Sequence, residues 1–411
     1  MAVGRTRQMR PTPAPRVGLL CEAGMGNIGN DASMEAVLAY LQTQHPGAVL
    51  DIMCANADKV QAQYGVPASR MAWYSARPRL PRPLAVVAKI FGKTIDPLRI
   101  ASWVRGHDAI IVSGTGILDA TLPVRPWGPP LVLFAAGVAS RVFGVKIAYV
   151  SVGAGPINQR MSRRLFCWAA RMASYRSFRD AESRAAVRKW GLPTSDDYVY
   201  PDLAFALPAP AAEVEDPHLV CVGVMDYHGS NDDRRSTQDI RRSYVLQMKR
   251  FIRWLLSEGR DVRLLVGDIN GSDDEIVQEI LTDIRSEIPD LGASRLTAPP
   301  VATFSDILQE MSPARSVVAI RYHNVVAALM LGKPTVAISY GLKHDSLMAD
   351  AGLPEFCLPV KDLKHDQLVH SFSVAEERAA EIRGELLVQR SANAKLLAEQ
   401  FATLTADLLG A

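Results

Sequence analysis

The stretch Ser316–Lys343, with the sequence SVVAIRYHNVVAALMLGKPTVAISYGLK, decides the fold class of this chain. Residues 316–320 are an apolar run typical of a buried strand, the next residues predict a helix that ends near Gly332, and residues 335–339 form a second apolar run. Two buried strands joined by a helix form a βαβ unit, the building block of parallel sheets covered by helices. The stretch therefore predicts an α/β fold with an open parallel sheet.

Three basic side chains follow the strands of this unit. Arg321 and His323 come directly after the first strand, and Lys343 follows the second. Open α/β sheets bind ligands outside the carboxyl ends of their strands, and the amino end of a helix favours an anion there. We therefore expect these side chains to surround a phosphate or a carboxylate. The alternative for His323 is a structural role, in which it caps the helix and bonds a backbone carbonyl.

Length and composition bound the class of protein. A chain of 411 residues predicts two domains, and 48% apolar with 22% charged residues is typical of globular proteins. A net charge of +3 argues against a dedicated nucleic-acid binder. Five dispersed cysteines favour reduced thiols over a disulfide framework or a zinc site. We expect a cytoplasmic protein, with the inner face of the membrane as its alternative location, and leave its oligomeric state open.

Two segments resemble targeting or membrane signals only superficially. Residues 1–15 carry three arginines and three prolines without an apolar run, so we expect a flexible tail and no signal peptide. Residues 131–152 are long and apolar, but Arg141, Gly144 and Lys146 interrupt them. They predict a helix followed by a buried strand, and no transmembrane segment.

Glycine-bearing segments follow three predicted strands of the first half. The strands are expected at residues 17–21, 109–112 and 147–152, with a further strand at 49–54. Parallel strands would bring the three segments to one edge, where backbone N–H groups could hold an anion. For the first segment a tight turn that only packs helix on strand is an equal alternative. The residues concerned are Gly26, Asn27, Gly29, Gly114, Gly153 and Gly155.

Residues 64–91 are basic and broken by prolines. Such segments are usually solvated loops, and a lid that binds an acceptor or a membrane surface is the alternative. Further along, Arg179 follows a short predicted strand, as Arg321 does. It is a second candidate anion ligand, unless it only pairs with Asp180 or Glu182.

The second half repeats the alternation of strands and helices. We therefore predict two doubly wound, Rossmann-like domains that face each other across a cleft. The expected parts are a tail (1–15), a first domain for the acceptor and part of the donor site (16–205), a linker (206–217), a second domain for the donor anion (218–372) and a helical segment that packs back on the first domain (373–411).

Several of these stretches together resemble the polysaccharide pyruvyltransferase family. The resemblance extends from Val17 to about Leu353 and implies a fold of the two-domain GT-B type. One departure is Asn30, which stands where the family usually has an acidic residue. The matching stretches are residues 26–29, Ser113-Gly114 with Gly116, residues 151–156, 177–180, 201–205, 321–323 and 332–343.

This resemblance implies transfer of pyruvate from phosphoenolpyruvate to two hydroxyls of a sugar in a glycan or glycolipid, giving a cyclic ketal and phosphate. Arg179, Arg321 and Lys343 would bind the doubly anionic donor, for which the arginine fork is suited. His323 would be the general acid that protonates the methylene carbon. The base is open between Asp202, Asp31 and Asp226.

No metal-ligand spacing is present in the sequence, so we expect neither a metal nor another cofactor. The expected partners are phosphoenolpyruvate and the acceptor, with no nucleic acid and with peripheral membrane contact as an option. Two other functions are consistent with the same residues. One is a GT-B nucleotide-sugar glycosyltransferase, and the other is a non-catalytic glycan-binding protein in which Arg179 and Arg321 form only ion pairs.

Overall fold

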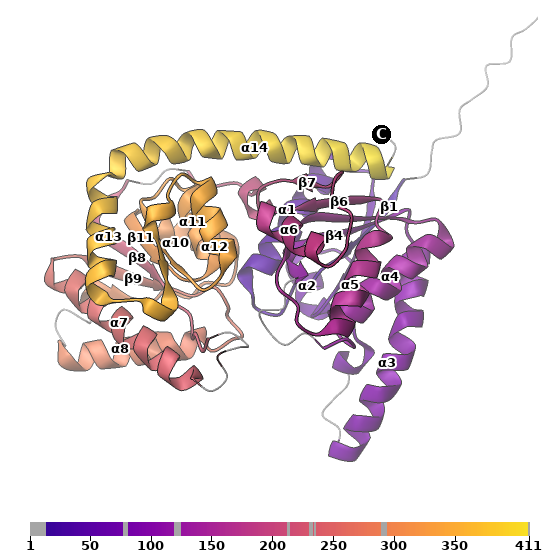
Figure 1. Cartoon of the computed structure of the whole chain (residues 1–411), viewed down its shortest axis with the longest axis horizontal. Helices are drawn as coiled ribbons and strands as arrows, with labels where there is room; N and C mark the ends of the chain where they lie inside the picture. The colour runs from indigo at the N-terminus through magenta and orange to yellow at the C-terminus, as the bar shows by residue number, and fades with distance from the viewer. Residues whose placement is uncertain are drawn as a thin grey trace, which may run out of the picture.

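The computed structural model of the chain describes residues 14–76, 81–118, 125–211, 214–229, 233, 236–288 and 294–409. Two α/β halves lie next to each other, and each has one central sheet with helices on its faces (Figure 1). The first sheet has the order β3-β2-β1-β4-β5-β6-β7, and the second has the order β10-β9-β8-β11-β12-β13. All strand pairs in both are parallel, so the predicted fold class is confirmed.

The first domain is built on the seven-stranded sheet. Its strands are β1 (Arg16–Leu20), β2 (Val49–Cys54), β3 (Ala68–Arg70), β4 (Ala109–Leu118), β5 (Lys146–Ala154), β6 (Tyr175–Phe178) and β7 (Tyr198–Val199). Its helices are α1 (Ile28–Gln44), α2 (Ala57–Tyr64), α3 (Arg82–Arg105), α4 (Pro129–Phe143), α5 (Arg160–Arg171) and α6 (Ala181–Lys189), with 3₁₀ turns η1 (Trp73–Ala76) and η2 (Leu203–Ala206).

The second domain is built on the six-stranded sheet. Its strands are β8 (Asp216–Gly223), β9 (Asp261–Leu265), β10 (Leu296–Thr297), β11 (Ala314–Ala319), β12 (Thr335–Ser339) and β13 (Cys357–Pro359). Its helices are α7 (Thr237–Ser257), α8 (Asp273–Glu287), α10 (Phe304–Met311), α11 (Tyr322–Met330), α12 (Leu342–Asp350) and α13 (His365–Glu377), with turns η4 (Pro354–Phe356) and η5 (Val360–Asp362). None of the helices in the described ranges is long and apolar enough to cross a membrane.

The stretch that decided the fold class forms the predicted βαβ unit. β11 and β12 are parallel neighbours, with Val317 opposite Thr335, and α11 connects them. Both strands are buried along almost their whole length because helices cover both faces of the sheet. The order of strands reverses between β8 and β11 and, in the first sheet, between β1 and β4, which places two ligand-binding switch points in this fold.

Two of the predicted glycine loops are wrong, because they belong to strands. Ser113–Gly116 lie within β4, and Gly153 lies within β5. Gly114 is glycine because of strand packing: a Cβ there would be 2.9 Å from the carbonyl oxygen of Ser151. Ser151 itself has a φ of 46°, a left-handed conformation that is strained for any residue other than glycine.

The solvated loop predicted for residues 64–91 is also wrong over its second part. Helix α3 begins at Arg82 and continues to Arg105, although a proline, Pro97, stands inside it. The basic and proline-rich composition masked the apolar periodicity of its residues. The tail predicted for residues 1–15 lies outside the described residues except for its last two positions.

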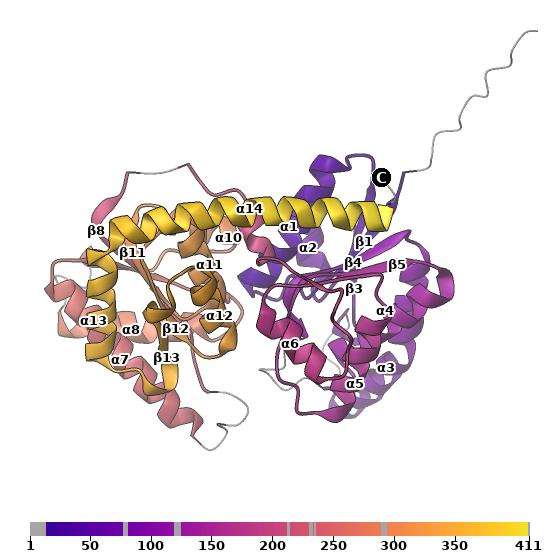
Figure 2. The same cartoon turned by 45° about the horizontal axis from the view of Figure 1, so that its top comes forward.

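Helix α14 (Ala379–Leu409) follows the second domain and runs along both (Figures 1 and 2). Its second part packs on the first domain, where Phe401 stacks on Tyr40 with ring centroids 4.3 Å apart. The fully buried Gln400 donates to the hydroxyls of Ser151 and Ser177, each at 2.8 Å. One side chain of the terminal helix therefore satisfies two buried polar groups at the centre of the first sheet.

We expect Gln400→Ala to lower the free energy of unfolding by about 2–3 kcal/mol, because the buried Ser151 hydroxyl loses its partner and the Ser177 hydroxyl loses one of its hydrogen bonds. Urea denaturation followed by circular dichroism measures this change. The matched control is Val388→Ala on the same helix, whose exposed side chain should contribute less than about 0.5 kcal/mol. Equal stability of the two variants would show that this contact does not hold α14 in place.

Candidate functional site

The loops at the carboxyl edges of the two sheets meet, and the backbones of two of these loops pair across the domain boundary. Ile28 N–H donates to the Gly267 carbonyl at 3.1 Å, and Ile269 N–H donates to the Gly26 carbonyl at 3.0 Å. The pairing joins the loop after β1 to the loop after β9 as a short antiparallel bridge. The two domains are therefore held at the edge where open sheets bind ligands.

This pairing corrects the expectation of an open phosphate cradle at Gly26, Asn27 and Gly29. Asn27 caps α1, and its side-chain oxygen accepts from the N–H groups of Gly29 at 3.1 Å and Asn30 at 3.4 Å. The Gly24 N–H donates to the Asp31 carboxylate at 2.7 Å. These donors are therefore engaged within the protein, and the tight-turn alternative describes this loop.

Gly29 has a different role, which is to admit the ring of His323. A Cβ at position 29 would lie 1.8 Å from Nδ1 of His323, so only glycine permits this packing. His323 is the second residue of α11, at the carboxyl end of β11. The glycine-rich loop of the first domain thus forms one wall around the candidate general acid of the second.

Asp202 connects His323 with Arg179. Its Oδ1 lies 3.7 Å from His323 Nε2, and its Oδ2 lies 3.7 Å from Nη1 of Arg179. Burial acts to raise the pKa of the Asp202 carboxyl, but His323 and Arg179 outweigh this and hold the pKa below its usual range. Among the described residues, His323 Nε2 has no hydrogen-bond partner. This finding does not support the alternative in which it bonds a carbonyl.

Arg179 is buried between a glycine of its own domain and an aromatic ring of the second domain. Its guanidinium lies against Gly153, where a Cβ would be 2.6 Å from Cζ, and 4.6 Å from the ring centroid of Tyr322. The adjacent carboxylate of Asp180 is 3.4 Å from Nε and also caps α6. The pairing with Asp180 considered from the sequence is therefore present, together with a contact to the second domain.

Arg321 is held by a carboxylate of its own domain. Its Nε and Nη2 bond the two oxygens of the fully buried Asp273, at 2.7 and 2.6 Å. Its stem packs on Gly267, where a Cβ would be 2.9 Å away. Asp273 neutralises much of the charge of this arginine and fixes the plane of its guanidinium.

Lys343 lies in the first turn of α12, after β12. Its Nζ is 4.7 Å from the ring centroid of Tyr340 and 6.0 Å from that of Tyr322, and no ion pair forms with it among the described residues. The residues before α11 and α12, Arg321 and Gly341, provide no side-chain cap. Two helix amino ends and one lysine thus face the same sheet edge, an arrangement that favours an anion.

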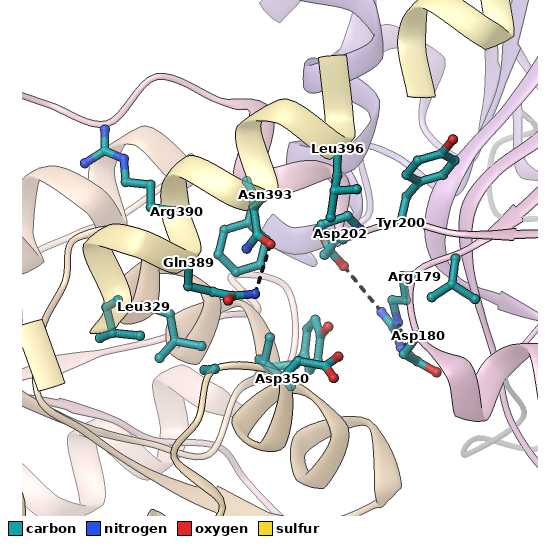
Figure 3. A pocket seen from close by; sticks show the side chains of 17 residues that line it. Arg179, Asp180, Tyr200, Asp202, Leu329, Asp350, Gln389, Arg390, Asn393 and Leu396 are labelled. Atoms are coloured by element: carbon teal, nitrogen blue, oxygen red, sulfur yellow. Dashed lines mark hydrogen bonds and ion pairs between the residues drawn. The ribbon is translucent and has the colours of Figure 1, made fainter. Parts of the chain in front are cut away.

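Arg179, Asp202 and His323 form a cluster, together with Lys343 and Arg321 at the same sheet edge. A cavity of about 210 Å³ lies beside this cluster, between the domains and α14. Figure 3 shows Arg179 and Asp202 on its first-domain side, Asp350 below, and Gln389 and Asn393 of α14 opposite. Carboxylates, amides and arginines share the lining with apolar side chains such as Leu329 and Leu386, so molecules with both hydroxyls and apolar faces match it.

The other residues predicted for the site lie around the cluster in different roles. Asp31 holds the Gly24 loop, and burial raises the pKa of its carboxyl. Asp226 bonds His228 at 2.8 Å and Arg241 at 2.5 Å; burial acts to raise its pKa, but these partners hold it below the usual range. Gly114 and Gly155 serve the β4 to β5 packing, since the Gly155 N–H donates to Leu118.

Sequence reasoning missed two groups that shape the site. Tyr322 and Tyr340 form aromatic surfaces for the cations, and the position of Tyr322 between Arg321 and His323 was the available signal. Asp273 stands 48 residues before its arginine, so no local pattern indicates the pair. In the described ranges, no group of three or more His, Cys, Asp or Glu side chains is arranged to hold a metal ion.

Comparison with known proteins extends these observations. A family model described as polysaccharide pyruvyl transferase matches residues 27–341, which is more than half of the chain. No curated protein sequence gives a match.

Several solved structures have a similar fold. Anabaena Alr3699/HepE, solved with UDP and glucose, has a TM-score of 0.56 at 14% identity, covering 94% of this chain and 99% of that one. A putative UDP-N-acetylglucosamine 2-epimerase from Listeria monocytogenes gives 0.61 at 12%, covering 97% and 98%. The lipopolysaccharide outer core galactosyltransferase WaaB gives 0.54 at 12%, covering 94% and 99%. The predicted GT-B-like arrangement is thereby confirmed.

We expect Gly29→Ala to displace the His323 ring from its position. The added methyl group occupies the space of the ring, so the imidazole becomes more accessible to solvent. Reaction with diethylpyrocarbonate, followed residue by residue with mass spectrometry, should modify His323 several-fold faster than in the wild type. Gly47→Ala is the control, since nothing lies within 4 Å of its added carbon. An unchanged rate in Gly29→Ala would contradict this packing.

His344, which lies next to Lys343, makes the free energy of unfolding depend on pH. Its ring is fully buried, Nε2 lies 2.9 Å from the Ile320 carbonyl oxygen, and burial, with the nearby Lys343, lowers its pKa to about 3. The unfolded chain, with an ordinary histidine pKa of about 6.5, binds a proton that the folded chain does not. Stability from this group is therefore present above pH of about 6.5 and is lost as the pH falls below it.

Between pH of about 7.5 and about 5.5, the wild type should lose about 1.4 kcal/mol more of its free energy of unfolding than His344→Gln does. Urea denaturation at the two pH values measures this difference. Replacement of the exposed His218 by Gln should leave the wild-type pH dependence in place. The same dependence in wild type and His344→Gln would show that His344 does not cause it.

Proposed function

Because the chain belongs to the polysaccharide pyruvyl transferase family, we propose that it transfers pyruvate from phosphoenolpyruvate to two hydroxyls of a sugar, forming a cyclic ketal and releasing phosphate. One observation carries the proposal. His323 of one domain and Arg179 of the other share the Asp202 carboxylate, at a sheet edge that also carries Lys343. A general acid beside cationic groups is what protonation of an anionic enol ester requires.

The donor has two anionic ends, and two kinds of group suit them. We assign the phosphate to Lys343 and the uncapped amino ends of α11 and α12, where backbone N–H groups and a compact ammonium converge. We assign the carboxylate to the guanidinium of Arg179, because a planar fork matches a carboxylate. Asp273 holds Nε and Nη2 of Arg321, so we assign to Nη1 the contact of this arginine with the donor.

In the proposed reaction, His323 in its protonated form gives a proton to the methylene carbon of the donor. The double bond breaks, and the neighbouring carbon becomes an oxocarbenium-like centre with a new methyl group. A first sugar hydroxyl adds to this carbon and returns its proton to His323. The second hydroxyl then displaces phosphate, whose oxygen takes up the second proton, and the ring closes.

Asp202 supports this role of His323 without contacting the donor. Its carboxylate stays ionised in the folded protein, because its pKa lies below the usual range despite burial. A buried negative charge 3.7 Å from Nε2 stabilises the imidazolium that protonates the substrate. Asp202 is therefore a positioning residue, while the base for the second hydroxyl is the released phosphate in this scheme.

The test combines donor binding with product formation. Wild-type protein, phosphoenolpyruvate and a set of sugars should release phosphate only when both substrates are present. In D₂O the ketal methyl group should gain one deuterium in the mass spectrum, since the proton of His323 exchanges with solvent. We expect His323→Ala to lower kcat by about 10²–10⁴-fold. Its affinity for phosphoenolpyruvate, measured by calorimetry, should change little.

Further variants distinguish the roles of the other residues. Lys343→Met and Arg179→Met should weaken phosphoenolpyruvate binding itself, and the exposed His218→Ala should match the wild type in both measurements. Full activity of His323→Ala would remove His323 from the mechanism. Turnover of a sugar nucleotide in place of phosphoenolpyruvate would favour a glycosyltransferase, and glycan binding without turnover would favour a binding protein.

A further inference from the structure

Helix α3 carries an exposed apolar face, which is unusual for a helix on the outside of a domain. Leu84, Val87, Phe91 and Leu98 follow one another at helical spacing, and Ile90 lies next to them. The exposed fractions reach 63% at Val87 and 72% at Leu98. Single exposed apolar residues are common, but a continuous stripe along one helix indicates a binding surface.

The charged residues of the same helix are nearly all basic. Lys89, Lys93, Arg99 and Arg105 are its described cations, and the sequence before residue 84 adds Arg77, Arg79 and Arg82. The one acidic residue, Asp96, is only 5% exposed, and its carboxylate accepts from the Trp73 N–H and from Arg99. Lys89 Nζ lies 5.2 Å from the Tyr74 ring centroid and Lys93 donates to the Trp127 carbonyl, so both lysines lie on the side of α3 away from Val87 and Leu98. A basic side opposite an exposed apolar stripe is the pattern of helices that lie in the surface of an anionic membrane.

The position of α3 permits such a contact. Its amino-terminal turns project beyond the rest of the first domain (Figure 1). Two adjoining cavities of about 380 and 440 Å³ lead from Lys89 and Ile90, past Lys93, to Met25 of the loop after β1 and Asn30 in the first turn of α1. An apolar groove thus runs from the exposed end of the helix to the edge of the site.

We propose that the exposed face of α3 docks this protein on an anionic phospholipid membrane, with Lys89 and Lys93 at the headgroups and Val87, Ile90 and Leu98 among the acyl chains. A second copy of the chain matches this surface less well, because a two-fold contact would place two copies of the same basic surface against each other. This docking proposal rests on the surface of α3 and does not require the proposed function. If the proposed function also holds, the groove would open the site toward an acceptor carried by the membrane.

Sedimentation of the full chain with vesicles tests the docking without any substrate, so its outcome and that of the transferase assay are independent. We expect binding to phosphatidylcholine vesicles that contain about a third of phosphatidylglycerol, and at least about tenfold weaker binding to phosphatidylcholine alone. Raising NaCl from about 0.05 to about 0.5 M should weaken the binding to the anionic vesicles.

Two double variants separate the apolar and the electrostatic contributions. Val87→Glu with Leu98→Glu, and Lys89→Glu with Lys93→Glu, should each reduce binding to the anionic vesicles at least about tenfold. The matched apolar control is Leu387→Glu with Val388→Glu on α14, which are also exposed. The matched basic control is Arg188→Glu with Lys189→Glu in the last turn of α6, where both side chains are exposed. Urea denaturation verifies that all four variants fold.

Three outcomes would overturn the proposal. The first is that wild-type protein stays in solution with both kinds of vesicle, and the second is that the α3 variants bind as the controls do. The third is that sedimentation equilibrium shows a dimer that the α3 variants abolish, which would assign the surface to a second copy of the chain.

Discussion

The buried carboxylate of Asp202 is the constraint on which the site depends. It follows the last strand of the first sheet, where its Oδ1 also accepts from the Ala204 N–H at 3.0 Å. A charge at this depth is costly unless it is compensated, and the compensation comes from both domains, through Arg179 and His323. The charge of Asp202 therefore requires that the two sheets lie close together and that the His323 imidazole stays next to its carboxylate.

Glycines make this arrangement possible by their lack of a side chain more than by flexibility. Gly29, Gly153 and Gly267 each lie against a functional side chain of the cluster: His323, Arg179 and Arg321. The contacts at Gly29 and Gly267 stand next to the backbone bridge between the domains. These three glycines therefore provide the space that the basic side chains of the cluster occupy.

The fold was predictable from local patterns, whereas the partners in the site were not. Residues 316–343 show their βαβ unit in two apolar runs, because strands covered on both faces are apolar throughout. The short strands β3 and β10 have too few residues to produce a pattern. The placement of His323 at a strand end followed from sequence, but its neighbours Asp202 and Gly29 come from the other domain. Loops predicted at Gly114 and Gly153 failed because glycine in a strand and glycine in a loop look alike until the packing partner is known.

The way α14 crosses the molecule also affects how the chain acquires its structure during synthesis. Gln400 and Phe401 complete the interior of the first domain, yet the ribosome makes them after the whole second domain. Until then the Ser151 hydroxyl lacks its partner, the Ser177 hydroxyl lacks one of its hydrogen bonds, and the strained backbone at Ser151 lacks its support. The first domain is thus completed only after the second domain has been made.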